Sequence, residues 1–498
     1  MIEKPIQKIL LVSPHYTALK GYKMDLSPPL GIAYVAAVLE REGYDVRIID
    51  AAAEDFWNRQ PIGGGFVRAG LDYKEIEKRI MDFGPDIVGV SCLLSSQFRD
   101  MCDICGLAKK ACKDVITVVG GEHPSALPEQ SLAMDCIDFV VIGEGEHAMR
   151  DLVRAINDDG DYSQIGGLGF KLSGDIVVNP KSRMIENLDE LPMPARHLLP
   201  MQTYFKTNIP QSGTSLRSPN TSMMTSRGCP AQCVFCATSK FWGNRCRMRS
   251  VESVLNEMEY LVEHYGVREI QFIDDNLTLD KERAIQIFDG MIKRQLNIVW
   301  NTPQGIAIWS LDDRILAKMK ESGCYEITLG IESGDQDVLR DIIKKPLKIE
   351  KIEPLVKVAR RLGLITKGYF VVGLPGETKE QMRRTFEFAR KLKLDAVGIF
   401  IATPLPGTRL YDICLEKGYL KEDFSFERII YAKGNIETPD FTAREVERLV
   451  SKNILLINLG LLLRNPVRFF KKYFRILSTN PRSLLSYVLL LVRESFKK

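Results

Sequence analysis

The chain has 498 residues, of which 45% are hydrophobic, 27% charged and 8% aromatic. This is the composition of a globular protein, and it excludes collagen-like, low-complexity and wholly disordered chains. At about 100–200 residues per domain, the length predicts two or three domains, each large enough to bury its own core. The net charge of +4 argues neither for nor against a nucleic-acid partner.

The beginning of the chain, MIEKPIQKILLVSPHY, lacks the long apolar core and the cleavage site of a signal peptide. The apolar stretches Asn453–Leu463 and Tyr487–Val492 are shorter than the roughly 20 residues that cross a bilayer. We therefore expect a cytoplasmic protein. Because that compartment is reducing, its eleven cysteines are not expected to form disulfides.

Short β-branched runs alternate with helical patterns over the first part of the chain. The expected strands are Lys8–Pro14, residues 45–51, Asp86–Cys92, Val115–Gly121 and Asp138–Glu146. Apolar strands separated by helices predict a parallel sheet covered on both faces, a doubly wound, Rossmann-like α/β domain over residues 1–158. Ligands of such sheets bind at the carboxyl ends of the strands. Those ends carry Pro14-His15, Ser91-Cys92-Leu93, Gly120-Gly121 and Gly143-Glu144-Gly145-Glu146.

Residues 159–220 read as a short β-rich connector followed by a linker, Asn187–Pro200. A second series of strands and helices follows over residues 221–440. After the strand that begins at Met223, its expected strands are Glu269–Asp275, Ile298–Ile306, Glu326–Gly334, Lys367–Glu377 and Ala396–Thr408. Six such repeats predict a full or partial TIM-like β/α barrel, with its site at the carboxyl ends of the strands.

The strongest chemical signal is Cys229-x-x-x-Cys233-x-x-Cys236, in a loop just after the first strand of the second series. Three thiolates in one tight loop can hold three irons of a cubane cluster and leave the fourth iron open to a substrate or cofactor. The alternative is a structural zinc loop. Zinc in such a site normally has four protein ligands, and the one further candidate nearby is Cys246.

With these residues the sequence resembles the radical SAM superfamily, and specifically its members with an N-terminal cobalamin-binding domain, such as anaerobic Mg-protoporphyrin monomethyl ester cyclases and hopanoid-biosynthesis enzymes. The resemblance covers nearly the whole chain to about residue 412. It implies that Cys229, Cys233 and Cys236 bind a [4Fe-4S] cluster whose open iron chelates S-adenosylmethionine (SAM). The implied SAM contacts are Phe235, Asp274, Asp275, Glu332, Ser333, Gly373, Glu377 and Pro404.

The resemblance extends to the first domain. It implies that Ser91, Leu93, Gly120 and Gly121 cradle the nucleotide tail of cobalamin. Gly143 and Glu144, at the end of a further strand, are expected to contact the cofactor from the same rim. The loop after the first strand, however, departs from the Asp-x-His-x-x-Gly pattern of many cobalamin domains, since it offers His15 without the Asp or the closing Gly. Two readings stay open: cobalamin bound with no protein ligand below the cobalt, or a domain that keeps the fold without the cofactor. His123 and His147 lie on the same rim, where loop anchoring is the commoner role of a histidine.

The last segment, residues 441–498, is predicted to be helical and differs in charge from the rest. From Ser451 onward it carries ten Lys or Arg residues against one acid, Glu494, a net charge of +9. Basic amphipathic helices rich in Leu and Phe lie in the plane of anionic membranes. The alternative is that these helices pack on the barrel. We expect peripheral contact with the inner face of the cell membrane and no nucleic-acid partner.

Taken together, the resemblance implies a radical SAM enzyme that cleaves SAM to a 5′-deoxyadenosyl radical and functionalises an unactivated C–H bond. Cobalamin-assisted methylation or a cyclisation would follow, on a hydrophobic substrate such as an isoprenoid, hopanoid or other lipid, or a tetrapyrrole. Flavodoxin or ferredoxin would supply the electron. The alternatives are a tRNA-modifying methylthiotransferase-like enzyme and a cobalamin-binding sensor without catalysis, which would not need the three cysteines.

Overall fold

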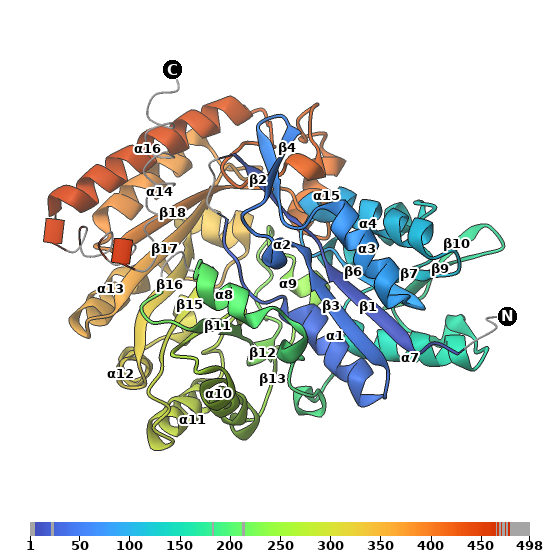
Figure 1. The fold of residues 1–498 in the computed structure, drawn as a ribbon. Coiled ribbons are helices and arrows are strands. Elements are labelled where there is room, and N and C mark those ends of the chain that lie inside the picture. Colours follow the sequence, from blue (N-terminus) through green and yellow to red (C-terminus); the bar gives the residue numbers. More distant parts are fainter. Residues whose placement is uncertain are drawn as a thin grey trace.

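The computed structural model describes residues 5–20, 24–181, 184–211, 215–464, 466–467, 470, 474 and 477–478. Two α/β units lie side by side (Figure 1). The first unit, in blue to teal, is built on a seven-stranded sheet, and the second, in green to orange, on a six-stranded sheet that curves into an open barrel. The predicted fold class is confirmed in both parts.

The first sheet has the strand order β10-β9-β8-β7-β6-β1-β3. Its strands are β1 (Lys8–Ser13), β3 (Asp45–Asp50), β6 (Ile87–Ser91), β7 (Ile116–Gly120), β8 (Phe139–Val141), β9 (Leu168–Leu172) and β10 (Asp175–Val178). The first five are parallel, whereas β9 and β10 extend the edge antiparallel and account for the predicted β-rich connector. The chain reverses direction across the sheet between β1 and β6, which is where doubly wound sheets bind ligands.

Helices cover both faces of this sheet, because every parallel strand is apolar on both sides. They are α1 (Leu30–Arg41), α2 (Ala51–Glu54), α3 (Tyr73–Phe83), α4 (Phe98–Ala111), α5 (Glu122–Ala126), α6 (Pro128–Leu132) and α7 (Gly145–Asn157). One face buries α1 and α7 and is continuous with the core of the barrel, while the other buries α3 and α4 in a second cluster.

A small antiparallel sheet was not predicted. It has the order β2-β5-β4, with β2 (Tyr16–Leu19), β4 (Arg59–Gly63) and β5 (Phe66–Ala69). Its strands are four or five residues long and come from two separate insertions, so neither insertion shows a clear strand pattern by itself. The sheet rises above the first domain beside the orange loops that follow the barrel (Figure 1).

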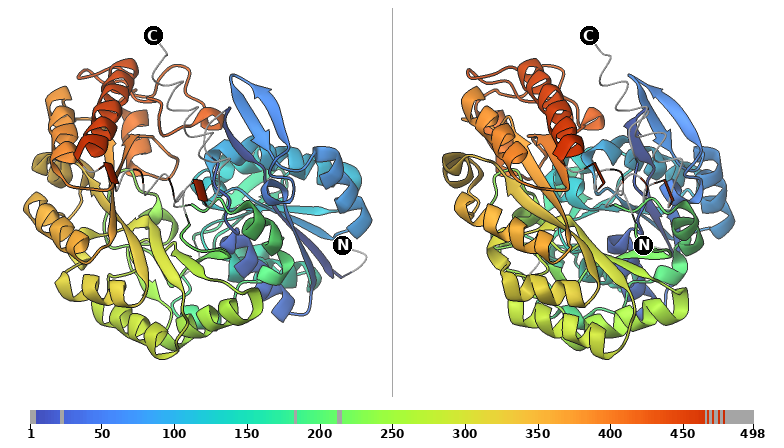
Figure 2. Two further views of the ribbon diagram at one scale, coloured as in Figure 1. Left: turned by 60° about the vertical axis from the view of Figure 1, so that its left-hand side comes forward. Right: turned by 90° about the vertical axis from the view of Figure 1, so that its left-hand side faces the viewer.

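The barrel sheet is parallel throughout, with the order β11-β14-β15-β16-β17-β18. The strands are β11 (Asn220–Met223), β14 (Glu269–Phe272), β15 (Val299–Ile306), β16 (Cys324–Glu332), β17 (Ile365–Val372) and β18 (Ala396–Ile401). The two ends of the series, β11 and β18, do not pair, so the predicted barrel is a partial one. Figure 2 shows the open side facing the first domain.

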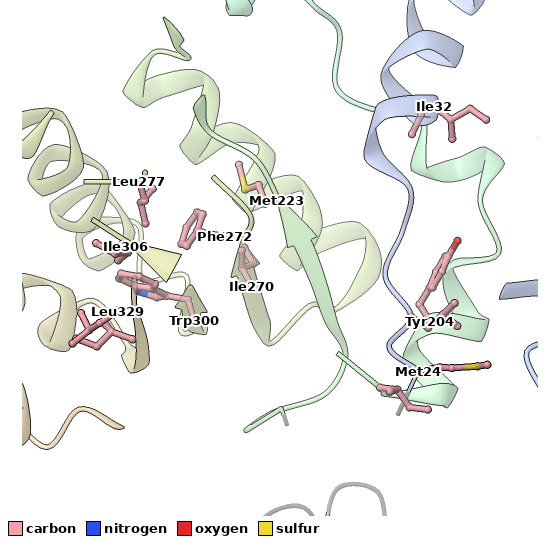
Figure 3. Packing of buried hydrophobic residues seen from close by; sticks show 14 of the residues in the cluster. Met24, Ile32, Tyr204, Met223, Ile270, Phe272, Leu277, Trp300, Ile306 and Leu329 are labelled. Atoms are coloured by element: carbon pink, nitrogen blue, oxygen red, sulfur yellow. The ribbon is translucent and has the colours of Figure 1, made fainter. Parts of the chain in front are cut away.

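The helices of the second part pack on the outside of this sheet (Figures 1 and 2). The outer helices are α10 (Val251–Tyr265), α11 (Lys281–Lys293), α12 (Asp313–Glu321), α13 (Ile352–Arg361) and α14 (Lys379–Lys391). The short α9 (Thr238–Phe241) and α15 (Arg409–Glu416) lie instead on the side of the first domain (Figure 1). Side chains at the N-caps of α10, α11, α12, α14 and α15 each accept a backbone N–H bond, which fixes where these helices begin. Between sheet and helices, Trp300 stacks on Phe288. Trp300 also meets Phe272 edge to face (Figure 3).

The predicted linker is part of the packed structure rather than a free tether. Arg196, 1% exposed, donates to Glu257 of α10 at 2.6 Å and to the carbonyl of Ser222 in β11 at 3.1 Å. The following helix, α8 (Met201–Thr207), places Tyr204 against Asp50 of the first sheet. The connector therefore binds both units through buried polar contacts.

The chain ends on α16 (Ala443–Arg464), which lies along α14 and β18. Val446, Val450 and Ile457 are buried against the barrel, whereas Leu455, Leu456, Leu459 and Leu463 are exposed. None of the described helices is long and apolar enough to cross a membrane. The second predicted tail helix, over residues 480–498, lies outside the described residues.

Candidate active site

The three cysteines of the motif lie in a loop closed at its base by a short antiparallel pair, β12 (Ser226–Arg227) and β13 (Arg247–Met248). The loop opens on Gly228, where a Cβ would sit 2.5 Å from the carbonyl oxygen of Arg245. Cys229, Cys233 and Cys236 are half-buried, and the N–H of Cys236 donates to the carbonyl of Cys233 at 2.9 Å. Burial raises the pKa of all three thiols, that of Cys233 to about 12, so a bound metal must displace their protons.

This donor set fits a cubane cluster better than a single ion. Among the described residues, no three His, Cys, Asp or Glu side chains converge as ligands of one metal. A [4Fe-4S] cluster has no such requirement, because each cysteine binds a different iron. The loop is also anchored to the barrel at its middle: the N–H of Val234 donates to Ile343 at 2.9 Å, and its carbonyl accepts from Leu410 at 2.8 Å. Phe235 follows and packs half-buried against the core.

Asp274 and Asp275, directly after β14, hold the two sides of the cysteine loop. Asp275 accepts from the N–H of Gly228 at 3.1 Å and from the hydroxyl of Thr238 at 2.9 Å. One oxygen of Asp274 accepts from Thr225 and Ser226, while its other oxygen, Oδ2, is buried without a hydrogen-bond partner among the described residues. Such an orphaned acceptor suits a cofactor amine, as the resemblance implies for this position. Both carboxylates therefore shape the loop as well.

Glu332 meets a residue that the sequence patterns did not single out. Its carboxylate pairs with the ammonium of Lys345 at 2.8 Å, both side chains being about nine-tenths buried. The lysine lies over the ring of Trp309, 5.5 Å from its centre. Burial lowers the pKa of Lys345, but Glu332 and the nearby cysteines outweigh it and the pKa is raised. A positive charge thus stands beside the cysteine loop, where it favours thiolates or a ligand carboxylate.

The predicted SAM contacts after β16 and β17 make buried hydrogen bonds to neighbouring residues of the barrel. Ser333 bonds to Thr385 at 3.0 Å. Glu377 accepts from the N–H groups of Gly373 and Leu374 at 2.8 and 3.1 Å, and burial raises its pKa to about 8. Its Oε1 is buried without a partner among the described residues. Glu377 thus closes its own turn, and Pro404 lies just beyond β18 at the same end of the barrel.

On the first domain, Ser91 and Gly120 end β6 and β7, and Leu93 and Gly121 lie in the loops that follow, at the predicted rim. Gly121 has a φ of +111°, and a Cβ there would lie 2.6 Å from the carbonyl oxygen of Cys92, so the two loops touch through backbone. Leu93 and Leu94 stand 57% and 42% exposed on this rim. Apolar side chains left uncovered beside a glycine-lined edge fit a large planar cofactor such as cobalamin.

His15 and His123 each use one ring nitrogen in a hydrogen bond, while the other, Nδ1 of His15 and Nε2 of His123, is buried without a hydrogen-bond partner among the described residues. His15 is buried, with Nε2 bonded to the carbonyl of Leu71 at 2.7 Å and its ring against Tyr73. His123 bonds through Nδ1 to Ser95 at 3.0 Å between the rings of Phe98 and Phe426, and burial lowers its pKa to about 4. His147 lines a cavity of about 250 Å³ together with Asp151 and Gln164. The burial of His15 agrees with both readings of its loop, cobalamin with no protein ligand below the cobalt and a domain without the cofactor.

Glu144 joins the two domains, and its predicted cofactor contact stays a prediction. Oε1 accepts from Arg227 at 2.7 Å, and Oε2 accepts from Arg247 at 2.7 Å and from the N–H of Ile185 at 2.8 Å. Arg227 and Arg247 are the two ends of the cysteine loop, and Arg227 also pairs with Glu146 at 2.6 Å. Burial opposes the charge of Glu144, yet the arginines hold its pKa below the usual value. Glu144 is thus a clasp between the two domains, while Gly143, before it, lies against Lys181.

Comparison with known proteins agrees with this arrangement. A B12 binding domain family model matches residues 25–153, and a radical SAM superfamily model matches residues 223–389. The chain is 34% identical to cytidylyl-2-hydroxyethylphosphonate methyltransferase of Streptomyces wedmorensis, over 90% of this chain and 89% of that one. It is 28% identical to anaerobic magnesium-protoporphyrin IX monomethyl ester cyclase of Rubrivivax gelatinosus, over 84% and 72%.

A solved structure shares the fold. The radical SAM methyltransferase TsrM of Kitasatospora setae, with cobalamin and a [4Fe-4S] cluster bound, superposes with a TM-score of 0.66 at 19% identity, over 83% of this chain and 78% of that one. The two matched domains, the cysteine loop and the relative that aligns over nearly its whole length identify the cofactors as a [4Fe-4S] cluster, SAM and cobalamin. This chain belongs to the family of cobalamin-binding radical SAM enzymes.

Proposed function

We propose that this enzyme transfers a methyl group to an unactivated carbon of its substrate. The observation that carries the proposal is the clasp at Glu144, which ties the rim of the cobalamin-type domain to both ends of the cysteine loop. When bound, the cluster and SAM supply a 5′-deoxyadenosyl radical that removes hydrogen from a C–H bond, and cobalamin supplies the methyl group. Both groups must reach one carbon atom, so their two sites must be held at a fixed separation.

The side chains of the protein hold and shield these groups. The three cysteines bind iron, Asp275 fixes the loop that carries them, and Lys345 provides positive charge beside it. The continuous core between the barrel and the α1–α7 face excludes water from the base of the site. A one-electron donor such as flavodoxin or ferredoxin completes the reaction.

Methyl transfer is preferred over ring closure because the chain is more similar to the methyltransferase than to the cyclase, at 34% against 28% identity. Anaerobic reconstitution with iron, sulfide and cobalamin tests the proposal. We expect near-stoichiometric cobalamin after desalting, and equal amounts of 5′-deoxyadenosine and S-adenosylhomocysteine during turnover. 5′-Deoxyadenosine without S-adenosylhomocysteine would favour cyclisation. The triple variant Cys229→Ala/Cys233→Ala/Cys236→Ala is the control, and it should form no 5′-deoxyadenosine.

We further propose that the substrate has a hydrophobic body and that the enzyme meets it at the membrane surface. Leu455, Leu456, Leu459 and Leu463 form an exposed stripe on α16 that leads into the basic tail. Apolar stripes flanked by Lys and Arg bind anionic bilayers. Sedimentation with phosphatidylglycerol vesicles should be lost in Leu459→Glu/Leu463→Glu and kept in Leu172→Glu, at an exposed leucine on β9. Equal sedimentation of both variants would contradict the proposal.

A further inference from the structure

The side chain of Lys181 joins the first domain to the loop that carries the cysteines. Lys181 lies three residues after the end of β10, and its ammonium donates to the carbonyls of Lys240 and Phe241, each at 2.7 Å. Those carbonyls end α9, the one-turn helix that begins two residues after Cys236. The last carbonyls of a helix have no partner inside it, so Lys181 supplies donors that α9 lacks at its end.

The backbone that carries Lys181 has a fixed base on the first domain. Asn179, two residues earlier, is buried, and its side-chain amide donates to the carbonyls of Tyr162 and Ile165 at 2.7 and 2.8 Å. Both acceptors belong to the segment between α7 and β9. The ammonium of Lys181 therefore holds the end of α9 at a position that depends on the first domain and not on the barrel alone.

The alkyl chain of Lys181 lies against the glycine rim of the first sheet. A Cβ at Gly143, where φ is +83°, would sit 2.7 Å from Cε of Lys181. The N–H of Gly143 donates to the hydroxyl of Ser125 at 2.9 Å, and that hydroxyl donates to the carbonyl of Gly121 at 2.6 Å. The two rim glycines that are expected to contact cobalamin are thus tied to each other and to Lys181.

At its other end, α9 is tied to the base of the cysteine loop. The hydroxyl of Thr238 donates to Asp275 at 2.9 Å, and the carbonyl of Thr238 accepts from the N–H of Trp242 at 2.7 Å. The ring of Trp242 lies 4.9 Å from the guanidinium of Arg227, two residues before the first cysteine of the motif. A displacement of α9 would therefore move both sides of the loop, and Cys236 with it.

A continuous set of contacts thus runs from the glycine rim to the cysteines. Its members are Gly121, Ser125, Gly143, Lys181 and α9. Cobalamin is expected at one end of this set and the cluster at the other. When one bound group orders such a set, less ordering remains for the second, and the coupling has the same size in both directions.

We propose that Lys181 is a positioning residue that couples the cobalamin site to the cluster site, so that each cofactor binds more tightly when the other is in place. The inference rests on the proposed function, in which both cofactors act on one carbon atom. It adds that the first domain helps to set the shape of the cysteine loop, through a lysine that lies in neither cofactor motif.

Cobalamin affinity measured with and without the cluster tests the coupling. Calorimetric titration with hydroxocobalamin compares the anaerobically reconstituted protein with the same full chain after chelation of its iron. We expect the cluster to tighten cobalamin binding about tenfold. Lys181→Met keeps the length of the side chain but removes its N–H donors. It should bind cobalamin like the parent protein without the cluster, and it should lose most of the tenfold gain.

Two further variants separate positioning from a general effect on the fold. Lys181→Arg retains N–H donors and should retain the gain. Lys171→Met should also retain it, because Lys171 donates to a backbone carbonyl as well, that of Met134 at 2.9 Å, but within the first domain. By reciprocity, cobalamin should raise the iron that the parent protein retains against a chelator, and it should do so less in Lys181→Met.

Several results would overturn the inference: equal cobalamin affinity with and without the cluster, no cobalamin binding in either form, or a gain that survives Lys181→Met. A loss of affinity in Lys181→Met of equal size in both forms would also overturn it, since that is the mark of a purely structural contact. So would a loss of the gain in Lys171→Met. The titrations need no turnover, so a failure of methyl transfer would leave their result intact.

Discussion

Two carboxylates on the same rim of the first sheet meet opposite surroundings. Glu144, after β8, accepts from two arginines and a backbone N–H, and its pKa is lowered in spite of burial. The carboxylate of Glu122, after β7, makes no hydrogen bond among the described residues. Burial and the charge of the nearby Asp275 raise its pKa to about 7. Position on the rim therefore does not decide whether an acid is charged. The residues that it meets from the other domain decide this, namely arginines for Glu144 and a second carboxylate for Glu122.

Breaking the clasp should have the largest effect. Glu144→Ala removes the carboxylate that Arg227 and Arg247 share at 2% and 3% side-chain exposure. Arg227 keeps Glu146, but Arg247 stays buried without an acid, and such a loss costs about 3–5 kcal/mol. Urea unfolding measures it. Because the pKa of Glu144 is lowered, its contribution is fully present above the ordinary carboxyl pKa of 4.5 and is lost as the pH falls through the lowered pKa of the folded state. Wild type and variant should therefore converge in stability at low pH. If the two proteins still differed in stability at low pH, the charge of Glu144 would not be what joins the two domains.

Replacing Gly121, the glycine before Glu122, should have the second-largest effect. Gly121→Ala places a Cβ 2.6 Å from the carbonyl oxygen of Cys92 at a φ of +111°, which costs about 1–3 kcal/mol. Cobalamin retention should fall with it, because the two rim loops must separate. Gly106→Ala, in α4 with no atom within 4 Å of the added Cβ, is the matched control and should gain about 0.5–1 kcal/mol. Equal cobalamin content in both variants would show that the glycine serves the fold alone.

Removing the carboxylate of Glu122 should have the smallest effect, and it should stabilise the protein rather than destabilise it. The folded pKa of Glu122, about 7, lies above its ordinary value of 4.5, so the folded state keeps a proton that the unfolded state has lost. Stability from this group therefore falls as the pH rises from about 4.5 to about 7. Glu122→Gln should be more stable than wild type by about 1–2 kcal/mol above pH 7 and equal to it near pH 4. Thermal unfolding across this range checks the sign.

The sequence was sufficient for the periodic elements and for the cysteine motif, because both depend on neighbours in the chain. The predicted strands also placed Gly121 and Glu144 on the rim of the first sheet, because each lies at or just after the end of a strand. The partners of these residues were not predictable, since Arg227 and Arg247 reach Glu144 only after the domains dock. Lys345 was missed for the same reason, because its role depends on an ion pair with Glu332, which lies on a separate strand.

The placement of SAM contacts remains a prediction at several strand ends. The structure brings Asp274, Glu332, Ser333 and Glu377 to one end of the barrel with two buried oxygens unpartnered among the described residues. Much of their bonding, however, is internal: Glu377 closes its own turn and Asp275 holds the cysteine loop. A motif in the sequence does not separate an acid that touches a cofactor from one that shapes the loop around it.

The short β12–β13 pair has a consequence for modularity. Its two arginines are held by a residue of the other domain, so the cysteine loop is closed from outside its own barrel. A barrel expressed alone would expose Arg227 and Arg247 and free the base of that loop. We therefore expect that neither domain can be replaced by the corresponding domain of a relative without loss of this contact. A chimaera that pairs this barrel with a foreign cobalamin domain needs an acid at the position of Glu144 before it can assemble its iron.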